Sequence, residues 1–181
     1  MNLSYTLIRS SRKTISIVIK PGGTVEVRCP KRCSKREADA FVQSKRDWIE
    51  KHLLAMAEKP ALPVLQPEEI RALANRAAEI LPGRVQYFSR QMGVSYGSIT
   101  IRSQKTRWGS CSAKGNLNFN CLLMLCPEEV QDYVVIHELC HRKELNHSAA
   151  FWAEVARYCP DCRTHRKWLK DNGGCLIARL P

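Results

Sequence analysis

The 181-residue sequence predicts a mixed α+β fold. Two observations favour this class. In short segments near the N-terminus and around residue 100, apolar residues recur at every second position, which is the period of half-buried strands. In longer segments they recur at intervals of three and four residues, which is the spacing of one helix face. Strands and helices in separate stretches of chain are typical of an α+β protein.

The first 60 residues are predicted to contain a hairpin and a helix. Apolar residues are spaced by two within 14–28, and Pro21-Gly22-Gly23 supplies turn residues in the middle of that segment. Ser34 and Glu37 have the spacing of a capping box, so a helix is expected to begin there. Its apolar stripe continues to Leu54, which predicts one long helix.

Two further helices are predicted from a shared starting signature. Pro67-Glu68-Glu69 and Pro127-Glu128-Glu129 each place a proline in the first turn and acidic side chains at the positive end of the helix dipole. We expect the first of these helices to break or kink at Pro82-Gly83 and to resume up to Gly93. The second is apolar nearly all round, which is typical of a helix inside a domain.

Two short strands are predicted at 98–102 and 116–120, joined by a loop that contains Arg107-Trp108-Gly109-Ser110. This loop can line a cleft, where the glycine would allow close approach and Arg107 would stabilise developing negative charge. The alternative is that Trp108 packs in a tight turn and that Arg107 is solvated. The sequence leaves both interpretations open.

Composition narrows the class of protein. Lys and Arg number 29 against 17 Asp and Glu, a net charge of +12, which favours an anionic partner. In the first 60 residues the basic excess is typical of a solvated helix face, and binding of a nucleotide or nucleic acid is the alternative. The apolar runs are too short to span a bilayer, so an integral membrane protein is excluded. Because the first residues lack the apolar block of a signal peptide, we expect a cytoplasmic protein. The odd count of nine cysteines favours reduced thiols over a disulfide framework.

The most informative contradiction lies in the last of these predicted helices. Although it is apolar nearly all round, it carries His137, Glu138 and His141 in the pattern H-E-x-x-H. Ionisable groups in a buried helix are costly unless something pairs with them. Positions four apart share a helix face, so the two imidazoles can bind one metal ion. Glu138 would lie beside the ion, where its carboxylate can take a proton from a water molecule.

A third ligand is expected because catalytic zinc usually has three protein ligands and one open position. His147 follows the first histidine by ten residues, which allows the helix to end and the chain to turn back, with Asn146 in a left-handed conformation and Ser148 capping the next helix. Glu144 and Glu154 are alternative third ligands. An open fourth position favours catalysis over a structural metal site.

These residues carry a family resemblance. Arg107-Trp108-Gly109-Ser110-Cys111-Ser112, the H-E-L-C-H motif, Asn146-His147-Ser148 and Phe151-Trp152 resemble the YgjP-like family of bacterial metal-dependent hydrolases, which is similar to SprT-like and other small zincin-type metallopeptidases. The resemblance implies one zinc ion held by His137, His141 and His147, with Glu138 as the catalytic base.

The resemblance also implies the architecture. It indicates a zincin-like fold, in which a small twisted antiparallel sheet packs on helices and covers a central H-E-x-x-H helix. The whole chain, 1–181, would form a single metallopeptidase domain, with 1–60 as a basic subregion of hairpin and helix and 61–181 as the catalytic core. In zincins an edge strand above the metal binds an extended peptide by strand addition. The segment 98–102 is the first candidate for that strand, and 116–120 is the second.

The predicted function is therefore a zinc-dependent hydrolase, most simply a metallopeptidase acting on a peptide or protein. Arg102, Arg107 and Trp108 are candidate substrate-binding residues. One alternative is a metal-dependent nucleotide hydrolase, in which Arg102 or Arg107 would bind the phosphates. Another is a non-catalytic, basic nucleic-acid-binding module with structural zinc. Cys159 and Cys162 could suggest a second zinc site, but a fourth ligand is missing unless a distant residue supplies it, so we expect ordinary core cysteines.

Overall fold

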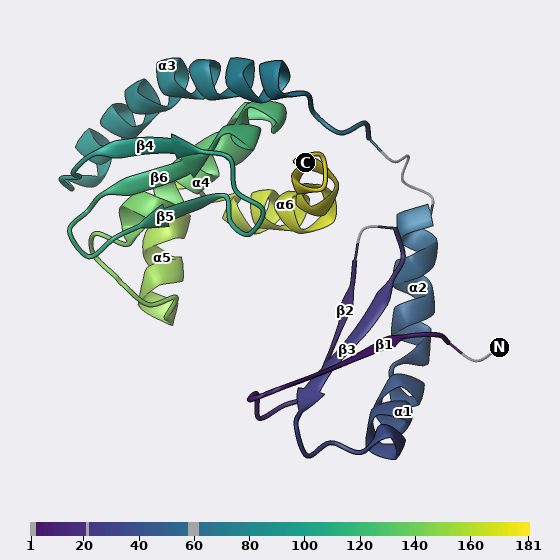
Figure 1. Cartoon of the computed structure of the whole chain (residues 1–181). Helices are drawn as coiled ribbons and strands as arrows, with labels where there is room; N and C mark the ends of the chain where they lie inside the picture. Colours follow the sequence, from purple (N-terminus) through teal and green to yellow (C-terminus); the bar gives the residue numbers. More distant parts are fainter. Residues whose placement is uncertain (1–2, 21, 58–61) are drawn as a thin grey trace. The chain divides into compact units, whose positions relative to one another are not determined.

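The computed structural model describes residues 3–20, 22–57 and 62–181 of the chain (Figure 1). These residues form two compact units, and the second unit is Leu62–Pro181. Each unit has a three-stranded sheet with helices, so the predicted α+β class is confirmed. The predicted boundary between residues 60 and 61 lies outside the described residues. That both units act as one domain stays a prediction.

The sheet of the first unit contains the predicted hairpin. Its strands are β1 (Thr6–Ser10), β2 (Ser16–Ile19) and β3 (Val25–Pro30), in the order β1-β3-β2. The central strand β3 runs antiparallel to β2, as a hairpin requires, and parallel to β1. Gly22 and Gly23 both have positive φ angles, +86° and +80°, which glycine adopts without the cost that a Cβ would add. Position 21 of the predicted turn lies outside the described residues.

The single long helix predicted after this sheet is two helices, α1 (Lys35–Ser44) and α2 (Arg46–Ala57). The start is as predicted, because the Ser34 hydroxyl accepts from the Glu37 amide and the Glu37 carboxylate accepts from the Ser34 amide at 2.7 Å. In the last turn before the break, the Ser44 hydroxyl donates to the carbonyl three residues back at 2.8 Å. Lys45, with φ −115° and ψ 14°, then separates the two helices.

One face of the first sheet packs on these helices, and the other carries a buried carboxylate. The apolar cluster consists of Val25, Val27, Cys29, Cys33, Ala38, Val42 and Ile49. Because side chains alternate along a strand, Glu26 and Arg28 point to the opposite face of β3. The Glu26 carboxylate is only 6% exposed, and it forms ion pairs with Lys20 and with Arg28, the latter at 3.0 Å. This unit therefore neutralises the charge that it buries.

The second sheet repeats this order with strands β4 (Ile99–Arg102), β5 (Gly109–Cys111) and β6 (Leu117–Asn120), arranged β4-β6-β5. The two predicted strands are present as β4 and β6. The third strand, β5, lies inside the segment predicted as a loop. Because the chain turns back at β5 before it forms β6, β6 is parallel to β4 and antiparallel to β5. Both sheets are therefore mixed, whereas a purely antiparallel sheet was predicted.

Three helices of the second unit begin where the sequence predicts, namely α3 (Pro67–Met92), α4 (Glu128–Cys140) and α5 (Ala149–Tyr158). The structure adds two that were not predicted, the helix α6 (Cys162–Ile177) and the 3₁₀ helix η1 (Cys121–Leu125) before α4. The long helix α3, which is curved in Figure 1, does not end at its internal proline, and it stops at Gly93, which has a φ of +63°. No helix in the described ranges, the 26-residue α3 included, is apolar enough over sufficient length to cross a membrane.

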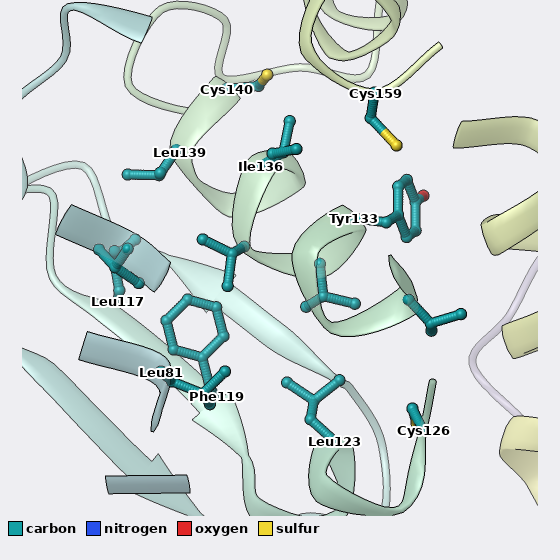
Figure 2. Packing of buried hydrophobic residues seen from close by; sticks show 14 of the residues in the cluster. Leu81, Leu117, Phe119, Leu123, Cys126, Tyr133, Ile136, Leu139, Cys140 and Cys159 are labelled. Atoms are coloured by element: carbon teal, nitrogen blue, oxygen red, sulfur yellow. The ribbon is translucent and has the colours of Figure 1, made fainter. Parts of the chain in front are cut away.

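The core of the second unit surrounds α4 (Figure 2). Leu81 of α3, Phe119 of β6, Leu123 of η1 and Leu139 of α4 are all fully buried. Burial of one such side chain stabilises a protein by roughly 1.5–3 kcal/mol. The cysteines Cys140, Cys159 and Cys162, which lie on or near this helix, belong to the same apolar cluster. Contacts on several sides hold α4 in place, so the polar residues at its C-terminal end are presented from a rigid support.

Candidate metal centre

The H-E-x-x-H histidines lie at the C-terminal end of α4. His137 is in the last turn of the helix, and His141 is the residue that ends it, with φ −64° and ψ −10°. One turn separates them, and their ring centroids are 5.1 Å apart. The two imidazoles therefore project from the same side of the buried helix toward one point.

His147 joins them from the segment that connects α4 to α5. Its Nε2 atom is 3.0 Å from Nε2 of His137, and its ring centroid is 4.8 Å from that of His141. One ligand nitrogen from each ring lies within 4.8 Å of the others, and this is the only such group of His, Cys, Asp or Glu found in the described part of the chain. The two alternative ligands, Glu144 and Glu154, are outside it.

The return of the chain to His147 differs from the prediction at one residue. Asn146 was expected to turn the chain in a left-handed conformation, but none of the described non-glycine residues has a positive φ. Instead, the Asn146 carbonyl accepts a hydrogen bond of 2.8 Å from the Ser148 amide. Ser148 then caps α5, as predicted, by accepting from the Phe151 amide at 3.3 Å.

These three side chains fit a zinc ion. On a tetrahedral ion with bonds of about 2.0–2.1 Å, two nitrogen ligands lie about 3.4 Å apart. The separation of 3.0 Å between His137 and His147 is close to that value. Nδ1 of His141 lies 3.0 Å from the carbonyl oxygen of Glu144. A proton on Nδ1 can be donated to this oxygen, which leaves the lone pair of Nε2 for a metal ion. Nδ1 of His137 is buried without a hydrogen-bond partner, so packing orients that ring.

Burial favours the uncharged form of two of these imidazoles, those of His137 and His147. It lowers the pKa of His137 to about 3, with a further contribution from His141 and His147. Burial also lowers the pKa of His147 below its ordinary value, and His141 acts in the same direction. Histidine binds a metal only as the neutral imidazole, so burial favours the form of His137 and His147 that coordination requires.

The ring of Phe151 packs against all three imidazole rings. This residue of the first turn of α5 is fully buried, and its ring centroid lies 4.6, 4.9 and 4.7 Å from those of His141, His137 and His147. Next to it, Trp152 lies 5.8 Å from two of the three rings. The sequence identified these aromatic residues only as part of a family motif. Their spacing gives no direct sign that they contact the histidines.

Glu138 lies between the histidines and β5. It is 5% exposed, and burial raises its pKa to about 8, although the charge of Arg107 and a hydrogen bond from the Cys111 amide act in the opposite direction. A Cβ atom at Gly109 would be 2.7 Å from Oε1 and 2.9 Å from Cδ of this carboxylate. Glycine is therefore required for the strand to approach Glu138 so closely, which agrees with the close approach expected from the sequence.

The three histidines and Glu138 border an open pocket of about 270 Å³. Its lining is Gly109, Ser110, Cys111, His137, Glu138, His141, Leu145 and His147. Gly109 and Ser110 belong to the segment that was predicted as a possible cleft lining, whereas sequence reasoning missed the contributions of Cys111 and Leu145. Cys111 belongs to a strand that shows no alternation of apolar residues, and Leu145 is a 66% exposed leucine in a connecting segment. The family motif around Gly109 was the one available sign of the strand.

The edge of the sheet that faces the pocket is β5. The amide of Asn120 donates to the Trp108 carbonyl at 2.8 Å, and that of Ser112 donates to the Asn116 carbonyl at 2.9 Å. Since main-chain groups alternate in direction along an antiparallel pair, those of Gly109 point away from β6 to the free edge. Of the two segments predicted as the peptide-binding edge strand, β4 is an edge of the sheet, the one opposite β5, and β6 is its centre.

The predicted substrate-binding residues lie outside the pocket lining. Arg102 is on β4, at the other edge of the sheet. Arg107 is exposed and acts on Glu138 through its charge. Trp108 is half-buried and packs on α6, where a Cβ at Gly173 would lie 3.0 Å from its ring. The packing interpretation thus describes Trp108 better than the cleft interpretation.

The solved structures that are similar to the chain include two metallopeptidase zymogens. Abylysin of Pyrococcus abyssi is 23% identical, with a TM-score of 0.46 over 50% of this chain and 93% of its own. Jannalysin of Methanocaldococcus jannaschii is 22% identical, with a TM-score of 0.45 over 50% and 94%. No curated protein matches the chain.

A family model covers most of the sequence. Residues 13–73 and 65–172 match the family described as YgjP-like, metallopeptidase domain, which together is well over half of the chain. The matched residues include the three clustered histidines, Glu138 and the strand β5. The chain therefore belongs to the YgjP-like metallopeptidase family.

Proposed function

We propose that this protein is a zinc-dependent peptidase. The observation that supports this best is the convergence of three imidazoles within 4.8 Å, next to a buried carboxylate and the free edge of a strand. In the proposed site His137, His141 and His147 hold one zinc ion. Glu138 is the general base, and β5 is the strand that binds the substrate.

The chemistry follows from the positions of these residues. A bound zinc ion would supply a Lewis acid that polarises the scissile carbonyl and makes a nearby water molecule more acidic. Glu138 accepts the proton of that water on its carboxylate and transfers it to the nitrogen of the leaving amine. Gly109 allows the carboxylate to occupy this place, and the Cys111 amide holds it there by a hydrogen bond.

The main chain of β5 determines how a peptide can bind. On its free edge the Cys111 amide is already engaged by Glu138, which leaves the amide and carbonyl of Gly109 for a ligand. An extended peptide can add to the sheet by pairing with these two groups. Its scissile bond would then lie over the histidines, and Leu145 at the pocket rim would contact an apolar side chain of the substrate.

Three variants of the full chain test this proposal. Glu138→Gln keeps one zinc per chain by elemental analysis but loses turnover of a mixed peptide library, because the metal ligands remain and the base is removed. His147→Gln loses both zinc and turnover. His165→Gln, a control histidine outside the group, keeps both. Wild-type turnover by Glu138→Gln would contradict the assignment of the base.

The nucleotide alternative can be tested in the same assay. It required Arg102 or Arg107 to bind phosphates, and neither lines the pocket. We therefore expect zinc-loaded protein to release no phosphate from nucleoside triphosphates. Phosphate release without peptide cleavage would overturn the peptidase assignment. The predicted contact of the basic N-terminal region with nucleotide or nucleic acid stays a separate prediction.

A further inference from the structure

The side chain of Arg142 connects the metal-site helix to the sheet. This residue directly follows His141, and its guanidinium reaches the turn between β5 and β6. Nη1 donates to the carbonyl of Ala113 in that turn at 3.2 Å, and Nε donates to the carbonyl of Ser95, in the segment before β4, at 3.0 Å. One planar cation therefore binds main-chain oxygens on two separate segments.

The guanidinium also lies directly against the backbone of the turn. A Cβ atom at Gly115 would be 2.9 Å from both Cζ and Nε of Arg142. Gly115 is buried, and its φ of +83° is one that other residues rarely adopt. Both the conformation and the closeness of Arg142 therefore require glycine at this position.

The turn that Arg142 holds is itself joined to β5. The Gly115 amide donates to the Ser112 carbonyl at 2.8 Å, and Ser112 is the residue after the strand. The Gly97 amide donates to the Gly115 carbonyl at 2.9 Å, which links the turn to the start of β4. Arg142 also forms a side-chain hydrogen bond with Cys111, the last residue of β5. Its contacts thus reach the strand both directly and through the turn.

We infer that Arg142 is a positioning residue, which holds β5 at a fixed place over Glu138 and the histidines. The strand has three residues and a single neighbour in the sheet, so its own pairing gives little stability. The inference rests on the proposed function, because β5 is taken as the strand that binds the substrate. Arg142 acts on the reaction through the position of Gly109 and does not itself contact the pocket.

The first test is Arg142→Gln in the full chain, with Arg71→Gln as its control. Arg71 is an exposed arginine of α3 with a single 3.8 Å ion pair to Glu68. In Arg142→Gln we expect the amides of Gly97 and Gly115 to exchange hydrogen at least about tenfold faster, because local opening becomes easier. For peptide cleavage we expect a KM about tenfold higher with kcat changed less than about threefold, and one zinc per chain retained. The control should change none of these.

The second test changes Gly115, the other partner in the contact with Arg142. Gly115→Ala places a methyl group against the guanidinium, whereas Gly93→Ala introduces a side chain at a φ of +63° with nothing within 4 Å. Both variants carry the strain of a positive φ, so the difference between them reports the contact with Arg142. Only Gly115→Ala should reproduce the faster exchange and the higher KM. Arg142→Lys, which can keep one of the two carbonyl bonds, should recover part of both effects.

The outcomes separate this inference from the proposed function. If wild-type protein cleaves no peptide, the function fails, but hydrogen exchange still shows whether Arg142 holds the turn. If peptides are cleaved and Arg142→Gln changes neither the exchange of the Gly115 amide nor KM, the positioning role is overturned. A loss of zinc in Arg142→Gln would also overturn it, because the effect would then act through the metal ligands.

Discussion

In the first unit β3 lies between β1 and β2, and in the second unit β6 lies between β4 and β5, with the same parallel and antiparallel neighbours. The two sheets differ in the strand that pairs antiparallel with the centre. In β2, Ile17 and Ile19 pack against an apolar cluster. In β5, Gly109 lies against a carboxylate and Ser110 lines a pocket. The same topology thus supports a core in one unit and lines the candidate metal site in the other.

The buried carboxylates next to the two sheets show the same contrast. Glu26 and Glu138 are similarly inaccessible, at 6% and 5% exposed. Hydrogen bonds from Lys20 and Arg28 lower the pKa of Glu26, whereas burial raises the pKa of Glu138 to about 8. In the first unit two cations neutralise the charge of the Glu26 carboxylate. In the second unit the charge of the Glu138 carboxylate is only partly neutralised, beside a site that fits a cation. This difference separates a structural carboxylate from one available for chemistry.

The largest expected effect on turnover is that of adding a single methyl group to β5. Gly109→Ala would place a Cβ 2.7 Å from the Glu138 carboxylate, so the strand and the carboxylate must move apart. We expect about a 100-fold loss of peptide turnover, since a displacement of about 1 Å at a reacting group has costs of this order. Zinc content should stay at one per chain.

Two controls relate this result to the comparison of the sheets. Ser16→Ala changes the corresponding first residue of β2, and Gly174→Ala adds a methyl group in α6 where nothing lies within 4 Å. Both should keep wild-type turnover. Equal losses in Gly109→Ala and Ser16→Ala would mean that the two strands do not differ in function.

A second, smaller effect is expected at the aromatic support of the metal site. Phe151→Leu removes the ring that contacts all three imidazoles. We expect zinc affinity to fall about tenfold, as is typical when a residue that orients metal ligands is changed. Competition with a chromophoric chelator measures this affinity. Val155→Ala, at a fully buried position on the same helix, should destabilise the fold but leave zinc affinity unchanged.

The same contrast explains what could be predicted from the sequence. Alternating apolar residues revealed β2, β3, β4 and β6, because each contributes side chains to a core. Gly109–Cys111 has no such alternation, since its role is to bring main chain close to Glu138, and β5 was therefore predicted as a loop. The spacing of His137, Glu138 and His141 along a helix was sufficient to group them, because helix geometry is local.

Features that depend on contacts between distant parts of the chain could not be predicted from the spacing of residues in the sequence. The contact of Phe151 with the histidines depends on how α5 returns to α4, and no local period encodes that return. The order of strands in the second sheet likewise depends on tertiary packing, so β6 was predicted as a candidate edge strand although it is the centre of the sheet. The division of the first long helix at Ser44 is a local event, but the apolar stripe through Leu54 concealed it.

A third effect concerns stability and has opposite signs in the two units. In metal-free protein, Glu138→Gln should raise the stability of the second unit by about 1 kcal/mol, because a buried carboxyl with incomplete compensation is replaced by a neutral group of the same shape. Glu26→Gln should lower the stability of the first unit, because it removes both ion pairs. Denaturant titration followed by amide signals of each unit measures the two changes. Destabilisation by both substitutions would remove the contrast between the carboxylates.

The smallest effect is the pH dependence of the first unit. Since the pKa of Glu26 in the folded protein is below its ordinary value of 4.5, its ion pairs contribute stability that is complete above about pH 4.5. This contribution is lost as the pH falls through the lowered folded pKa. The stability difference between wild type and Glu26→Gln should therefore be constant near pH 7 and disappear in acid. Glu50→Gln, which removes an exposed pair with Arg46, should show a smaller difference at every pH. A difference for Glu26→Gln that persists unchanged at pH 3 would show that its cations do not stabilise the fold through charge.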